Sequence, residues 1–176
     1  MIFGAAAPKI TYDLRAPPAS PTPGKTLSGQ LAIPEPTAVA MLETQRMLFS
    51  PVKDYPDFDG FLWADSIPKL VQARLIDSFE NYDIAHAPLR TADTGQADYQ
   101  LLVDVRRFRI ATEAEPTAEI ALSARLVDKN GKIITARLFE ASQKLDRLEP
   151  QAAVDAVNKA FGQIAMDMIG WTVMAF

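Results

Sequence analysis

The sequence contains no cysteine and only one histidine, and these two absences exclude several kinds of chemistry. Without a thiol, the chain can form neither a disulfide nor a thiolate metal site, and it has no cysteine nucleophile. The usual structural zinc sites need cysteine and histidine ligands that this chain cannot supply. His86 is then the one residue of its type available for acid–base catalysis.

Signals for membranes, nucleotides and nucleic acids are also missing. No run approaches the roughly 18 apolar residues that cross a bilayer, and the opening MIFGAAAP lacks the basic start of a signal peptide. No glycine-rich phosphate loop with a following lysine is present, so the chain is not expected to be an ATPase itself. The net charge of -4 and the absence of a lysine or arginine run argue against nucleic acid as a partner.

The residues that are present suffice for one hydrophobic core. Of 176 residues, 48% are hydrophobic and 23% are charged, a balance typical of a globular domain. We therefore predict a single domain over residues 1–176, in which residues 1–8 form a flexible start or a remnant.

Two helices are predicted from apolar periodicity. Asp65 or Ser66 can cap a helix over residues 66–81, and Pro68 suits its first turn, where a missing amide donor costs nothing. Its apolar face comprises Ile67, Leu70, Val71, Leu75 and Phe79. A second helix, from Pro150 to about Met174, carries an apolar seam of Val154, Val157, Phe161, Ile164, Met168 and Trp171.

The first half of the chain shows shorter, extended patterns. Residues 10–16 alternate as a strand would, and the four prolines of residues 17–24 predict a connector. Residues 45–50 and 60–65 suit two strands of a loose hairpin, and residues 82–88 suit a short strand.

A meander of three strands follows, and it completes the predicted fold. Residues 99–110, 117–127 and 132–142 alternate, with the turn DKNG before the last strand. In the first of them the alternation changes phase before Phe108, which indicates a bulge or an exchange of the buried face. We predict an α+β fold: a mainly antiparallel sheet of about five or six strands, with two principal helices packed on it.

Candidate functional residues are few, and each has a structural alternative. His86 has no nucleophile-elbow pattern to accompany it, and we interpret it as structural or incidental. In VRRFR, Arg107 and Arg109 would share one strand face and Arg106 and Phe108 the other, which favours solvent-facing charge beside a core phenylalanine. We predict no catalytic residue, metal site or cofactor.

Three aromatic residues are the candidates for contacts with a partner or ligand. They are Trp63, Phe108 and Trp171. Large aromatic side chains serve both as core anchors and as binding contacts. We favour the core for all three, with the binding role as the alternative.

The order of several segments resembles the ABC-type transport auxiliary lipoproteins, the PqiC-like family. They are TYDLRAP, LAIPEP, FLWADSIPKLVQARLIDSFEN, ADYQLLVDVRRFRI, IALSARLVDKNGKIITARLFEAS and a closing helix that ends in GW. The resemblance covers nearly the whole chain, and its specificity lies in the order of the segments, above all the tryptophan before a proline-capped helix.

This resemblance implies a periplasmic, non-enzymatic accessory component of an Mce-type ABC transport system for lipids or other hydrophobic compounds. Its partners would be an Mce-domain protein and an ABC permease and ATPase complex. A lipid and a second copy of the chain are further possible partners. Members are usually tethered, here to the outer membrane, through a lipidated N-terminal cysteine. That cysteine and the signal are missing from this sequence, so the chain is either trimmed to its soluble domain, which we favour, or a natural untethered member.

Two alternatives remain beside this function. The chain could be a freestanding periplasmic carrier of a lipid or apolar small molecule in its own cavity. It could also be a hydrolase that uses His86, in which case His86→Ala would abolish a measured activity, and we expect no such activity.

Overall fold

A computed structural model gives the fold, and it describes residues 4–6, 8–18, 27–82, 88–90 and 97–176. Three predicted segments fall largely or partly outside these residues: the connector over residues 17–24, the short strand over 82–88 and the flexible start over 1–8. His86 also lies outside them. The elements in chain order are β1 (Ile10–Tyr12), β2 (Leu31–Ala32), β3 (Thr37–Ala38), the 3₁₀ turn η1 (Ala40–Leu42), β4 (Phe49–Ser50), the 3₁₀ turn η2 (Pro56–Phe58), β5 (Phe61–Trp63), α1 (Ile67–Asn81), β6 (Tyr99–Ala111), β7 (Thr117–Asp128), β8 (Ile133–Lys144) and α2 (Pro150–Met174).

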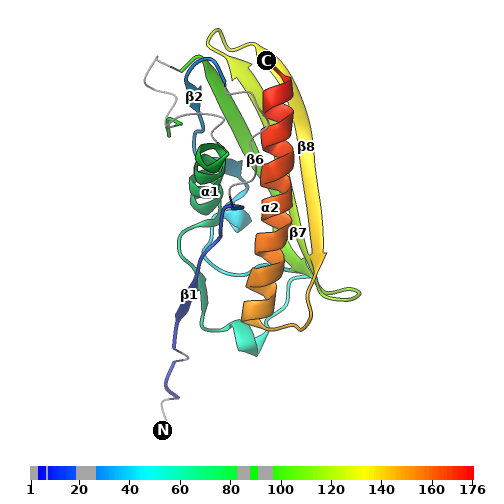
Figure 1. The fold of residues 1–176 in the computed structure, drawn as a ribbon. Helices are drawn as coiled ribbons and strands as arrows, with labels where there is room; N and C mark the ends of the chain where they lie inside the picture. Colours follow the sequence, from blue (N-terminus) through cyan, green and yellow to red (C-terminus); the bar gives the residue numbers. More distant parts are fainter. Residues whose placement is uncertain (1–3, 7, 19–26, 83–87, 91–96) are drawn as a thin grey trace.

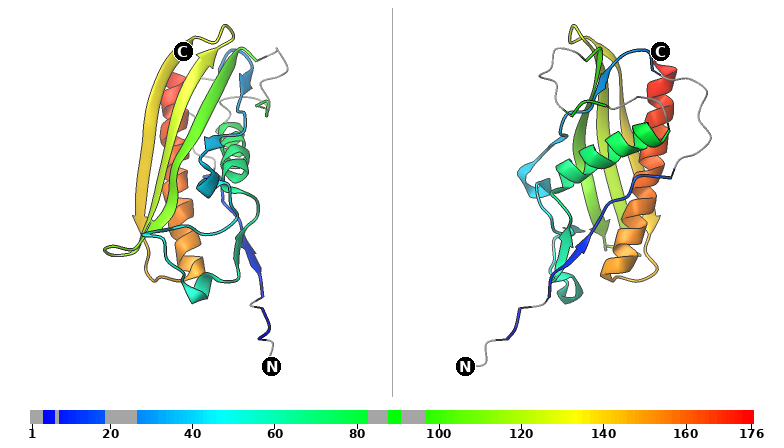
Figure 2. Two further views of the ribbon diagram at one scale, coloured as in Figure 1. Left: turned by 180° about the vertical axis from the view of Figure 1, so that it is seen from behind. Right: turned by 60° about the vertical axis from the view of Figure 1, so that its left-hand side comes forward.

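The elements form two layers, with both helices on the same face of a long sheet (Figures 1 and 2). Helix α2 runs along β7 and β8, and α1 lies crosswise to it (Figure 2). Neither helix within the described ranges has both the length and the apolar character to cross a membrane.

The predicted α+β class is confirmed, and the sheet is mixed rather than purely antiparallel. Strands β6, β7 and β8 form the predicted antiparallel meander. Strands β2, β3 and β4 add to the other edge of β6, each parallel to it, and a separate small sheet pairs β1 with β5, also in parallel. Because β2, β3 and β4 are only two residues long, their side-chain pattern carries no information about strand direction.

The predicted hairpin between residues 45–50 and 60–65 is wrong. Strand β4 pairs with the distant end of β6, where Phe49 lies opposite Ile110, and β5 pairs with β1. The first strand is also shorter than predicted. Its pairing with β5 ends at Tyr12, and beyond it the Leu14 carbonyl accepts a hydrogen bond from the Arg74 side chain of α1 instead of from a strand.

The predicted bulge in β6 is confirmed by a register shift between Val105 and Arg107. The extra residue, Arg106, is exposed and ion-paired to Asp104 at 2.5 Å. The expectation that Arg106 shares a face with Phe108 is therefore wrong, because strict alternation does not hold across a bulge. Phe108 itself is buried, as predicted.

Both predicted helices are confirmed, and their apolar faces form much of the core. All five apolar residues predicted for α1 are buried, and in the seam of α2 all but Trp171 are buried, Trp171 being half-buried. The predicted cap of α1 differs in detail: Ser66 occupies the N-cap position without a side-chain cap hydrogen bond, and the Asp65 carboxylate accepts a hydrogen bond from Ser66 N at 2.7 Å.

Candidate functional site

Trp63 lies at the point where β5, β6 and the chain before β4 meet. Its ring is fully buried and makes edge contacts with Phe61 and Phe108, at centroid distances of 5.1 and 5.8 Å. Its backbone N donates to the Gln45 carbonyl at 2.6 Å, and its carbonyl accepts from Gln45 Nε2 at 3.0 Å. This packing agrees with the role of core anchor.

The hydrogen bonds at Gln45 hold the segment between β3 and β4 away from β6. Strand β3 pairs with Asp104 and Val105, and β4 pairs with Ile110 and Ala111. On this edge, residues 106–109 of β6, which include the bulge, therefore have no paired strand within the described part of the chain. Bulges and unpaired edges of this kind are common next to binding sites.

A groove of about 340 Å³ opens at this gap, between β6 and residues 39–59. Its apolar lining includes the buried side chains of Leu42, Met47, Phe58 and Phe108, together with the half-buried Phe49. Val39, Met41 and Val52 form its lip and are 65%, 60% and 87% exposed. Of the three aromatic candidates, only Phe108 lines this groove.

Basic residues also border the groove, and three of them, Arg106, Arg107 and Arg109, belong to the bulged part of β6. Arg109 is paired with Glu119 at 3.0 Å and Arg107 with Glu140. Arg46 and Lys53 line the groove from the other side and have no ion-pair partner in the described part of the chain. The Lys53 ammonium lies 5.6 Å from the centroid of the Tyr55 ring.

Sequence reasoning missed this groove. It nominated Phe108 and noticed the arginines, but the lip residues belong to a stretch with no regular alternation. The only signal in the sequence was the hydrophobic character of Val39, Met41 and Val52 in a stretch without regular alternation, and their exposure became visible only in the structure.

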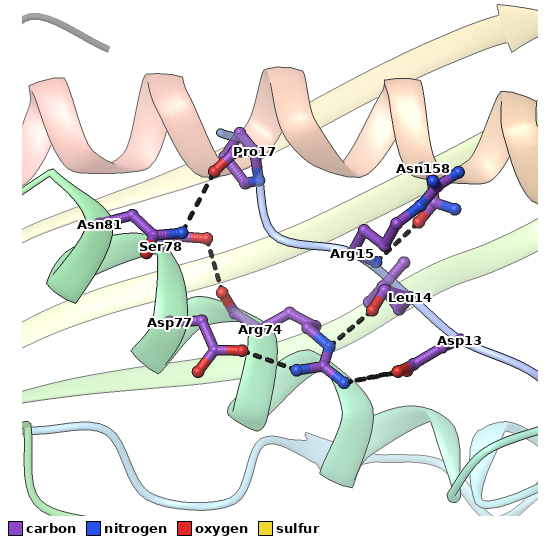
Figure 3. A network of polar contacts seen from close by, with 9 residues as sticks. All are labelled: Asp13, Leu14, Arg15, Pro17, Arg74, Asp77, Ser78, Asn81 and Asn158. Atoms are coloured by element: carbon purple, nitrogen blue, oxygen red, sulfur yellow. Dashed lines mark hydrogen bonds and ion pairs between the residues drawn. The ribbon is translucent and has the colours of Figure 1, made fainter. Parts of the chain in front are cut away.

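A second polar cluster joins the N-terminal segment to both helices (Figure 3). The guanidinium of Arg74 on α1 donates to the Leu14 carbonyl at 2.5 Å and is ion-paired with Asp13 at 2.8 Å and Asp77 at 2.6 Å. The next residue along the segment, Arg15, donates its backbone N–H to Asn158 Oδ1 of α2 at 2.8 Å. The cluster thus fixes the segment across α1 and α2.

The charge of Arg74 is secured by its surroundings. Partial burial would lower the pKa of its guanidinium, but the hydrogen bonds and charges of Asp13 and Asp77 outweigh that effect and raise the pKa. Because arginine is already protonated at any physiological pH, this shift strengthens a permanent contact and creates no pH switch.

We expect Arg74→Ala to lower the free energy of unfolding by about 2 kcal/mol, because charged hydrogen bonds contribute about 1.5 to 3 kcal/mol each and solvent weakens the pair with half-exposed Asp13. Asp13→Asn is the matched control: it removes one ion pair, leaves the bond to the Leu14 carbonyl, and should cost less than about 1 kcal/mol. Urea unfolding followed by circular dichroism measures both. Equal losses in the two variants would contradict the central role of Arg74.

Trp171 occupies a different place from the other two aromatic candidates. It is half-buried on α2, and its ring packs edge-on against Phe139 of β8 at 5.3 Å. The Arg137 guanidinium covers the Phe139 ring at 4.8 Å. Trp171 therefore combines a packing contact with an accessible surface.

No metal-binding arrangement is found in the described part of the chain: no group of three or more histidine, aspartate or glutamate side chains there could hold an ion.

Comparison with solved structures supports the architecture. The crystal structure of protein XCC0632 from Xanthomonas campestris matches with a TM-score of 0.83 at 24% identity, covering 94% of this chain and 95% of that chain. A second crystal structure, of an uncharacterized protein, matches with a TM-score of 0.66 at 14% identity, covering 94% and 99%. Both show the same fold.

Comparison with curated proteins and family models gives the relationship. The chain is 71% identical over 172 residues to the uncharacterized protein bll6063 of Bradyrhizobium diazoefficiens, an alignment that covers 98% of this chain and 47% of the relative. The chain thus spans about half the length of that curated relative. The family model for the ABC-type transport auxiliary lipoprotein component matches residues 12–169. The chain therefore belongs to the family of ABC-type transport auxiliary lipoprotein components.

Proposed function

We propose that this chain is a non-enzymatic periplasmic accessory component of an Mce-type ABC transport system that moves lipids or other hydrophobic compounds. The family match over residues 12–169 carries this proposal, since it runs from the last residue of β1 through most of α2. In the proposal, an Mce-domain protein and an ABC permease and ATPase complex are the partners, and a lipid anchor holds the natural protein at the outer membrane.

The polar chemistry of the described residues supports a structural role. The donors of Arg74 are directed at Asp13, Leu14 and Asp77 of the same chain, so this cluster holds elements together. The arginines of β6 are likewise engaged in ion pairs within the chain. An accessory subunit contributes contacts and a path for a poorly soluble substrate, and it does so without a reacting group.

Trp171 is the aromatic residue that we propose for contact with a partner subunit. Its half-buried ring lies over Phe139 of β8 and leaves part of its own surface accessible. β8 is an edge strand of the sheet, and aromatic residues are enriched in protein interfaces. A second copy of the chain is a further proposed partner at this edge.

Co-purification tests the proposal. The tagged full-length protein, extracted in mild detergent from the membranes of its own host, should recover an Mce-domain protein or its permease, identified by mass spectrometry. Trp171→Ala should reduce the recovery, and Met166→Ala, on the same helix with a side chain 46% exposed, serves as the matched control. Repeated failure under conditions that preserve related complexes would contradict the function.

The groove favours one alternative, a freestanding periplasmic carrier of a lipid or apolar small molecule. Native mass spectrometry of the purified protein separates the two functions. A stoichiometric lipid, together with no recovered membrane partner, would favour the carrier, and a lipid-free protein that recovers the permease would favour the accessory subunit.

A further inference from the structure

We propose that the groove between β6 and residues 39–59 binds a single-chain amphiphile with an anionic head group. The site is formed by this chain alone. The inference deepens the carrier alternative by naming the class of ligand, and it requires no transporter partner. It rests on three properties of the groove: where the fold opens it, what lines it, and which charges surround it.

The fold keeps the groove open. Gln45 is hydrogen-bonded to both the N–H and the carbonyl of Trp63, and Ile67 N donates to the Thr44 carbonyl at 3.0 Å. These bonds tie residues 44–45 to β5 and α1, so the segment cannot pair with residues 106–109 of β6. The opening is thus built into the topology and does not depend on the conformation of one side chain.

The apolar lining fits a hydrocarbon chain. Phe58, Phe108 and Met47 form a buried apolar surface within the groove. The lip residues Met41 and Val52 expose most of their apolar surface to water, which is unfavourable unless a ligand covers it. A volume of about 340 Å³ lies at the small end of the roughly 300 to 1,000 Å³ typical of ligand sites, which suits one chain better than two.

The charges around the groove favour an anionic head group. Five basic side chains line it against two acidic ones: Arg46, Lys53, Arg106, Arg107 and Arg109, with Asp54 and Asp59. The three β6 arginines are balanced by Asp104, Glu119 and Glu140, and the guanidinium groups of Arg107 and Arg109 reach across the sheet to β8 and β7. Arg46 and Lys53 are thus the cations of the groove that a ligand can pair with. A carboxylate or phosphate at the mouth can therefore ion-pair with Arg46 and Lys53, which have no ion-pair partner in the described part of the chain. Free fatty acids and lysophospholipids share this chemistry.

Methionine methyl groups report where a ligand binds. Two of the five methionines in the described residues, Met41 and Met47, line the groove, and the other three, Met166, Met168 and Met174, lie on α2. In the chain with isotope-labelled methionine methyl groups, titration with laurate below its micelle concentration should shift the signals of Met41 and Met47 and leave those of α2 unchanged. Equal shifts at both sets, or no shift up to the solubility limit, would overturn the site.

Charge reversal tests the head group. In the double variant Arg46→Glu and Lys53→Glu, laurate affinity measured by calorimetry should fall about tenfold or more, the factor that corresponds to about 1.4 kcal/mol. The matched control, Lys129→Glu with Lys132→Glu, makes the same charge change at the exposed turn between β7 and β8, and its affinity should stay within about twofold of the original chain. Equal losses of laurate affinity in both double variants would mean that only the net charge of the chain matters, and this would overturn the proposal.

The choice of ligand completes the test. Laurate and lysophosphatidic acid should both bind, which would show that the site accepts either a carboxylate or a phosphate head group. Binding of only one of them would identify which anion the site prefers. Either result supports the site. Dodecyltrimethylammonium, with a similar chain and a cationic head, should bind at least about tenfold more weakly than laurate. Equal or tighter binding of the cation would overturn the proposal, whatever co-purification shows about the transporter.

Discussion

Replacing Trp63 by alanine is expected to lower the free energy of unfolding by about 3 to 5 kcal/mol. The side chain is fully buried, and its loss would leave a cavity between Phe61 and Phe108. Because β5 and the segment of Gln45 converge there, little of that cavity can close by relaxation. Urea unfolding followed by far-ultraviolet circular dichroism measures the loss without relying on tryptophan fluorescence.

Trp63→Phe is the matched variant for this prediction. It keeps an aromatic ring and removes the indole Nε1, which is buried without a hydrogen-bond partner in the described structure. Since an unsatisfied buried donor costs about 1 to 3 kcal/mol, its removal offsets part of the lost packing, and Trp63→Phe should be clearly less destabilising than Trp63→Ala. Unchanged stability of Trp63→Ala with lost partner binding would instead make Trp63 an interface residue.

Phe161→Ala on α2 should have an effect of similar size, about 3 to 5 kcal/mol. Phe161 is fully buried in the middle of the apolar seam by which α2 covers the sheet and α1. Met166→Ala lies five residues further along the same helix with a side chain 46% exposed, and it should change stability by less than about 0.5 kcal/mol. The same unfolding measurement compares the two variants.

A small loss for Phe161→Ala, close to that of Met166→Ala, would show that α2 is not held to the sheet by this seam. The helix would then be available to pack on a partner, which the sequence pattern alone also allowed. The burial of the seam favours packing within the chain.

Local patterns predicted the long elements well. The spacing of Ile67, Leu70 and Leu75 and the position of Pro68 indicated α1, because a helix face is defined by side chains three or four residues apart. The bulge in β6 was also predictable, since a long alternating strand changes phase when one extra residue is inserted into it. Strands of 12 or 13 residues carry enough alternation to be identified individually.

Partner choice among the short strands was not predictable in the same way. Phe49 and Ser50 pair with Ile110 and Ala111, about sixty residues away, and their own neighbours in sequence do not indicate this. The pairing of β5 with β1 depends likewise on the core that both strands cover. Short strands are selected by tertiary packing, which no local periodicity reports.

The sequence by itself determined the two helices, the meander, the bulge and the resemblance to a transport auxiliary family, because each depends on neighbouring residues or on their order. Only the tertiary structure decided the parallel addition of β2, β3 and β4 to β6, the burial of Trp63 and the groove beside Phe108. These features arise where segments distant in sequence meet. The hydrogen bonds between Gln45 and Trp63 hold the segment between β3 and β4 away from β6, and the groove is the space between that segment and β6.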